Sequence, residues 1–164
     1  MMNPLKEEFF NSIVNCQRLT KLSFVGTNLC PDDIHTIIFS STIPLHEIYI
    51  RDYQSSLDFM FIHDSQDVQI SELKFSGLKT LVISNCQMLT DFGLMQLNMM
   101  LSLKYLDLSS TAVTCEFECD FSLHNLETLK LSHCRHGVTS YNIGLSSLIA
   151  AMLPFIETFA LLKA

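Results

Sequence analysis

The chain has 164 residues, of which 48% are hydrophobic and 16% charged, and this composition favours a folded domain with a sizeable core over a disordered chain. Its formal charge of -7, from 17 acidic and 10 basic residues, argues against nucleic acid or an anionic membrane as the main partner and favours a neutral or basic partner surface. The first ten residues do not resemble a secretory signal, and no apolar run approaches the roughly 20 residues of a membrane span. We therefore expect an intracellular protein, cytoplasmic or nuclear.

The N-terminal segment, residues 1–16, is predicted to form one amphipathic helix. Asn3 and Pro4 are typical of a helix start, because Asn caps free amides and proline already has a helical φ angle. The apolar residues of the segment recur every three to five positions: Leu5, Phe9, Ile13 and Val14. We expect this helix to cap the first layer of the core.

A nine-residue frame with apolar residues at positions 1, 4 and 6 then repeats along the chain. It is clearest over residues 103–111, 78–86 and 126–134. Six frames begin at Leu19, Leu45, Leu78, Leu103, Leu126 and Ile156. Such spacing is typical of a leucine-rich-repeat solenoid, in which stacked units share one core. We thus predict an α/β fold of about six repeats over residues 17–164, with a curved parallel sheet on the concave face and helices and turns on the convex face.

The segments that return from one frame to the next differ in their predicted structure. Helices are expected after Pro31, from Asp91 as the capping residue, and over residues 141–153. Residues 57–77 are expected to form an irregular insertion, and residues 112–125 a turn or a short 3₁₀ segment rather than a full helix. The last repeat is expected to be incomplete and to leave an unpaired strand edge.

The six cysteines are predicted to be reduced, because a large core and no apparent signal argue against a disulfide framework. Cys86 and Cys134 occupy frame position 9, where a small thiol points into the core. One weak metal-site alternative combines residues of two adjacent repeats: Cys115, Cys119, His133, Cys134 and His136. A CxxxC spacing is unusual for zinc, so we expect no metal and no other cofactor.

The third and fifth frames, LxxLxIxxC and LxxLxLxxC, with LTDFGL after the third, resemble the cysteine-containing subclass of leucine-rich repeats. That subclass is familiar from substrate receptors of cullin-RING ubiquitin ligases, namely F-box leucine-rich-repeat proteins and the ZYG/ZER receptors. The stretches LKYLDLSST and LETLKLSHC are especially similar to repeats of the latter group. The resemblance implies substrate capture for ubiquitination, with elongin and a cullin bound through regions outside this chain. A structural scaffold that supports a neighbouring domain is the alternative.

No common one-line enzyme motif occurs, neither a phosphate loop, a dinucleotide fingerprint, an HExxH helix nor a GxSxG elbow, so we expect no catalytic activity. Strand side chains alternate, so frame positions 3, 5 and 7 should face outward, with position 8 at the rim. Tyrosine and arginine among them are favoured as anchors of an interface. The predicted protein-binding residues are Tyr49, Arg51, Asp52, Val82, Tyr105, Asp107, Lys130 and His133.

Overall fold

The computed structural model describes residues 8–9, 11–13, 15–16, 18–40, 45–58, 61, 75–114, 123–134 and 158–160. Its strands are β1 (Lys21–Val25), β2 (Glu47–Arg51), β3 (Thr80–Ser84), β4 (Tyr105–Asp107), β5 (Thr128–Lys130) and β6 (Thr158–Ala160). Its helices are α2 (Pro31–Ser40) and α4 (Asp91–Met95), the latter continued by the 3₁₀ helix Gln96–Met99. Residues 8–9 and 11–13 are also helical.

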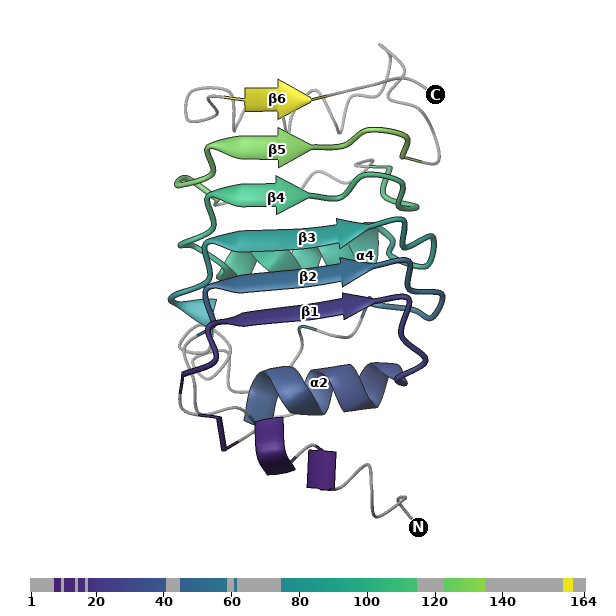
Figure 1. The fold of residues 1–164 in the computed structure, drawn as a ribbon. Coiled ribbons are helices and arrows are strands. Elements are labelled where there is room, and N and C mark those ends of the chain that lie inside the picture. Colours follow the sequence, from purple (N-terminus) through teal and green to yellow (C-terminus); the bar gives the residue numbers. More distant parts are fainter. Residues whose placement is uncertain are drawn as a thin grey trace.

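The strands form one parallel sheet of six, in chain order from β1 to β6, with α4 behind it (Figure 1). Each strand pairs with the next so that equivalent frame positions lie side by side. The row at position 4 is Leu22, Ile48, Leu81, Leu106, Leu129 and Phe159. This arrangement confirms the predicted α/β class and parallel sheet, and it is compatible with a solenoid.

The core lies between the sheet and the return segments. Leu81, Leu106 and Leu129 of the central strands are buried, as the frame predicts for position 4. In α2, Ile34 and Ile38 are fully buried, which agrees with the apolar face predicted from their spacing. Each buried row contacts the rows of neighbouring units, so the core is continuous along the sheet.

Two local predictions were wrong. Phe9, which we expected on the core-facing side of the N-terminal helix, is 51% exposed, and in the described part of that helix only Ile13 packs against the core. The helix α4 is capped by Thr90, whose hydroxyl accepts a hydrogen bond from the Phe92 amide, and not by Asp91. Asp91 is instead buried, and its carboxylate accepts hydrogen bonds from the amide and the hydroxyl of Thr114 in the next unit.

Several predictions fall outside the described residues. These are the start at Asn3, most of the insertion over 57–77, the turn after Thr114, the return helix over 141–153 and the end of the sixth frame after Ala160. Within the ranges given above, no helix is long and apolar enough to cross a membrane.

Candidate functional site

The predicted binding residues lie mainly on the outward face of the sheet, opposite α4, which we call the strand face. On β1 and β2 it carries the first cluster: Lys21, Glu47, Tyr49 and Arg51. The Tyr49 hydroxyl donates to Glu47 Oε2 at 2.9 Å, and Lys21 Nζ lies 3.0 Å from the same oxygen. Lys21 Nζ lies 4.4 Å and Arg51 Cζ 5.5 Å from the centre of the Tyr49 ring. The ring is therefore flanked by two cations.

The protonation states of this cluster follow from its contacts. The hydrogen bond from Lys21, and then that from Tyr49, lowers the pKa of Glu47, while the Glu47 contact raises the pKa of Lys21. Partial burial, followed by the hydrogen bond to Glu47, raises the pKa of Tyr49. Near neutral pH the cluster thus contains an ammonium, a carboxylate and a neutral phenol.

A second cluster on β4 and β5 consists of Tyr105, Asp107 and Lys130. Lys130 Nζ lies 5.3 Å from the centre of the Tyr105 ring, and a hydrogen bond with Tyr105 raises the pKa of Lys130. Asp107 Oδ1 accepts a hydrogen bond at 3.0 Å from the Ser109 amide, which holds the turn that follows β4. The two clusters share one arrangement, in which a cationic side chain lies over the ring of a half-buried tyrosine. The cation comes from an adjacent strand or from the strand that carries the tyrosine.

Strand β3 lies between the clusters and carries only short outward side chains: Thr80, Val82 and Ser84. Val82 is 2% exposed, so the prediction that it offers an accessible contact was wrong. It pairs with Tyr49 on one side and Asp107 on the other, and it is shorter than either. Val82 therefore belongs to the floor of the strand face.

Frame position 8 forms a row of left-handed residues at the ends of the strands. The row consists of Gly26, Asp52, Asn85, Ser110 and His133, whose φ angles lie between 54° and 58°. The backbone amides of the first four residues of this row each donate to the carbonyl at position 7 of the next unit, at 2.8 to 3.2 Å. Asp52 and His133 are exposed on this row, as predicted for the rim. The left-handed conformation of Ser110 and His133 could not be predicted from residue type, because left-handed residues are usually glycine or asparagine.

Behind the rim, the position-9 thiols have structural contacts. Cys86 Sγ donates to the carbonyls of Ser84 and Ile50, and Cys134 Sγ donates to that of Leu108. Burial raises the pKa of both thiols. The cysteines that the structure describes, which also include Cys16 and Cys30, are free.

The structure describes only two of the five residues of the alternative zinc site. Cys115, Cys119 and His136 lie outside the described residues, whereas His133 is exposed at the rim and Cys134 points to the Leu108 carbonyl. In the part of the chain that the structure covers, no three histidine, cysteine or acidic side chains gather as a metal site would require.

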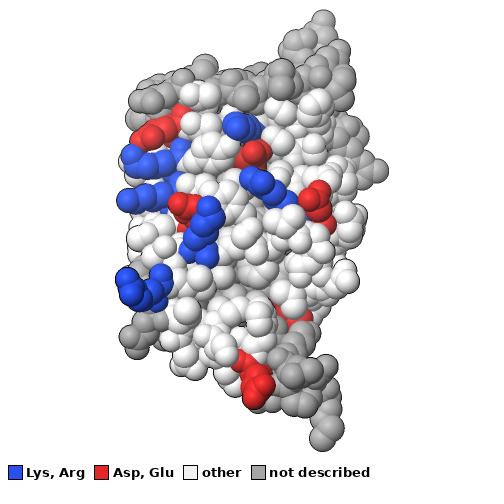
Figure 2. All heavy atoms as spheres, viewed as in Figure 1, with Lys and Arg blue, Asp and Glu red and all other residues white. Residues whose placement is uncertain are grey.

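Basic residues concentrate on the strand face and along the side where the strands begin (Figure 2). All six lysines and arginines in the described ranges lie in a strand or within three residues before one: Arg18, Lys21, Arg51, Lys79, Lys104 and Lys130. The same region contains four carboxylates, against six cations: Glu47, Asp52, Asp107 and Glu127. In the described parts of the return segments the charged residues are all acidic: Asp32, Asp33, Asp58 and Asp91. The region of the strands therefore carries two more cations than carboxylates, although the chain as a whole has a formal charge of -7.

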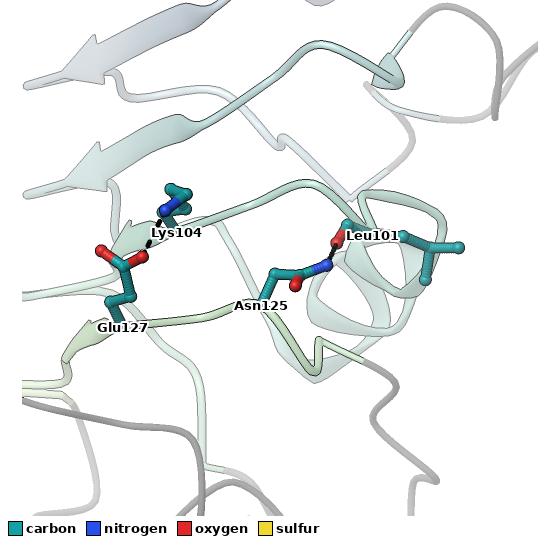
Figure 3. A network of polar contacts seen from close by, with 4 residues as sticks. All are labelled: Leu101, Lys104, Asn125 and Glu127. Atoms are coloured by element: carbon teal, nitrogen blue, oxygen red, sulfur yellow. Dashed lines mark hydrogen bonds and ion pairs between the residues drawn. The ribbon is translucent and has the colours of Figure 1, made fainter.

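Cross-links between adjacent units hold this basic edge in place (Figure 3). Lys104 forms an ion pair with Glu127, and Asn125 Nδ2 donates to the Leu101 carbonyl at 2.8 Å. The Lys104 carbonyl also accepts from the amides of Glu127 and Thr128, at 2.8 and 2.9 Å. Lys104 is thus already paired within the fold.

Comparison of the sequence with protein-family models and with curated proteins finds no match.

Proposed function

We propose that the chain is a non-enzymatic protein-interaction module built from cysteine-containing leucine-rich repeats, and that the strand face binds the partner. The observation that supports it best is the pair of cation and tyrosine clusters on one open sheet face, over a continuous repeated core. Half-buried tyrosine and arginine side chains that are held in place are the usual anchors of an interface.

Two repeated features support the assignment to leucine-rich repeats. Equivalent frame positions pair across all six strands, and the five frames described to position 8 turn through a left-handed residue there. Thiols at position 9 donate to carbonyls of the preceding turn or strand, which is what the cysteine-containing subclass would use them for.

We further propose that the partner is a substrate of a cullin-RING ubiquitin ligase, with elongin and a cullin engaged by regions outside this chain. Sequence resemblance supports this step. Purification of the tagged protein from cells tests it, because recovery of elongin and a cullin is expected. Recovery of a substrate without either would restrict the function to binding alone.

Photo-crosslinking tests the binding face itself. A benzophenone amino acid is placed at Ser23 or Thr128, which point outward from β1 and β5, and in controls at Gln54 or Met88, which lie in turns. We expect the two strand positions to capture the same protein and the turn positions not to do so. Capture of that protein from the turns alone would contradict the proposal.

The competing function, a structural scaffold, is favoured by one observation: Lys21 with Glu47 and Lys104 with Glu127 are satisfied within the chain. Under that hypothesis neither strand position captures a partner, whereas removal of the ion pairs lowers stability only slightly, as is usual for exposed pairs.

A further inference from the structure

The strand face contains cations that the fold itself does not neutralise. Lys21 and Lys104 are paired with glutamates, but Arg51, Lys79 and Lys130 have no carboxylate within salt-bridge distance among the described residues. Two of these three, Arg51 and Lys130, lie against the tyrosine rings of the two clusters. Within the described ranges, the carboxylates of Asp52 and Asp107 are outside ion pairs as well, and they accept hydrogen bonds from Asn85 and from the Ser109 amide. The region of the strands still carries two more cations than carboxylates, and two of its unpaired cations are held at defined points.

The side chains of Arg51 and Lys130 are also preorganised for binding. A guanidinium or ammonium that rests on an aromatic ring has lost part of its rotamer freedom and part of its hydration before a ligand arrives. A carboxylate that approaches either cation would thus gain a charge-assisted hydrogen bond at a reduced entropic cost. The hydrogen bond with Tyr105 and, to a lesser extent, the charge of Asp107 raise the pKa of Lys130, but Asp107 lies outside ion-pair distance and one of its oxygens accepts from the Ser109 amide.

The sheet sets the distance between the two cations. Arg51 is on β2 and Lys130 on β5, three strand spacings apart, which is about 14 Å at roughly 4.8 Å per spacing. An offset of two residues along the strands raises the separation of the attachment points to about 16 Å. An extended peptide covers this distance in about five residues, at roughly 3.3 Å each. Two strands lie between them: β3 has only short outward side chains, and β4 carries Tyr105 and Asp107, both half-buried.

We propose that the ligand of the strand face is an acidic peptide segment in extended conformation, which crosses the strands and places one carboxylate group on Arg51 and another, about five residues away, on Lys130. This inference deepens the proposed binding function and depends on it.

Fluorescence anisotropy with the full chain tests the proposal. The probe is a ten-residue labelled peptide with two glutamate pairs whose centres are about five residues apart, the spacing derived above. We expect the variant Arg51→Gln/Lys130→Gln to bind at least about tenfold more weakly, as loss of two charge contacts predicts. A matched control, Gln54→Glu/Met88→Glu, lowers the net charge equally at two exposed turn positions and should bind as the unaltered protein does.

Two further probes examine the chemistry and the spacing. A peptide with lysines in place of the glutamates should not bind, and one with all four glutamates adjacent should bind more weakly, because it cannot reach both cations. Equal binding of the adjacent and spaced peptides, or equal loss in the control variant, would overturn the proposal. Tighter binding of a ten-nucleotide single-stranded RNA at the same salt would also overturn it, since that ligand uses cations without regard to the peptide spacing.

The crosslinking experiment separates this inference from the function on which it depends. If Ser23 and Thr128 capture a protein but the acidic peptide does not bind, the binding face is correct and its ligand is not acidic. If neither position captures a protein, the proposed function fails as well.

Discussion

Asn85 donates a hydrogen bond from its side-chain amide to Oδ1 of Asp52, which lies 33 residues earlier, at 2.5 Å. Both residues have a φ angle of 54°, and both occupy position 8 of their frames. The left-handed turns at the strand ends are therefore linked between units by side chains as well as by backbone amides. This rim fixes where the strands end, and with it the place of Asp52 and Arg51 on the strand face.

The rim predicts opposite effects for two substitutions that leave every backbone hydrogen bond in place. Gly26→Ala should destabilise the protein by about 1 kcal/mol, because alanine strains a left-handed position, although its Cβ would meet no atom within 4 Å. Ser110→Gly should be neutral or stabilising by about 0.5 kcal/mol, because it removes the same strain. Urea denaturation of both variants measures the two signs. A loss of stability in Ser110→Gly would show that its side chain supports the fold.

The nine-residue frame predicted the strands and their alignment best where burial of apolar side chains alone determines the structure. Leu106 and the other position-4 residues align across the sheet because only a shared core can bury them. The burial of Val82 could not be predicted, since it depends on side chains of the adjacent repeats that the frame does not place. Nor could the basic strand face be predicted from net charge, which counts acids wherever they lie. Asp91 was assigned to the right helix terminus, but its partner Thr114 belongs to the next unit.

Substitutions of inward and outward strand residues should separate stability from binding. Leu106→Ala should cost about 2–5 kcal/mol, because the side chain is 1% exposed and contacts the core on both sides. Tyr49→Ala with Tyr105→Ala should instead shift the melting temperature by a few degrees and weaken partner binding, because both rings lie outward. Calorimetry combined with the crosslinking yield measures both effects. Unfolding of the tyrosine variant would mean that the rings are structural.

Buried Asp91 should be more important for stability than exposed Asp32, although each lies in the first turn of a helix. Asp91→Ala leaves the Thr114 amide, now bonded at 2.8 Å, without its acceptor, at a cost of about 1–3 kcal/mol. Asp32→Ala removes only a favourable helix-end charge, worth about 0.3–1 kcal/mol. Denaturation midpoints of the two variants give the comparison, and equal losses would contradict the proposed link between units.

At Gly93, in the interior of α4, helix propensity and packing predict opposite results. Alanine is favoured over glycine in a helix by about 1 kcal/mol. However, a Cβ at Gly93 would lie 2.6 Å from Leu89 Cδ1 and 3.1 Å from the backbone Cα of Asp58. We expect packing to dominate, because a shift of the Asp58 backbone would disturb the hydrogen bonds that its carboxylate accepts from Thr90. Gly93→Ala should therefore destabilise by about 1–3 kcal/mol. A stabilised variant would show that α4 can shift.

The thiols should react in an order set by their burial. Cys16 and Cys30 are exposed, whereas Cys86 is buried and Cys134 half-buried, with their pKa values raised by that burial. Because the thiolate is the reactive form, iodoacetamide near neutral pH should label Cys16 and Cys30 first and reach Cys86 only on unfolding. Mass spectrometry of peptides after timed labelling measures this order. Rapid labelling of Cys86 in the native protein would contradict its place behind the rim.

The same raised pKa values predict how stability depends on pH. The native state keeps the protons of Cys86 and Cys134 to higher pH than the unfolded chain does, so no stability is lost below the unfolded value of about 8.5. As the pH rises from there toward the folded pKa values, the unfolded state releases protons first and the free energy of unfolding falls. Urea denaturation at several pH values above neutrality measures this slope, and Cys134→Ala, which removes one of the two thiols, should make it shallower. An unchanged slope in that variant would assign the alkaline loss to other groups.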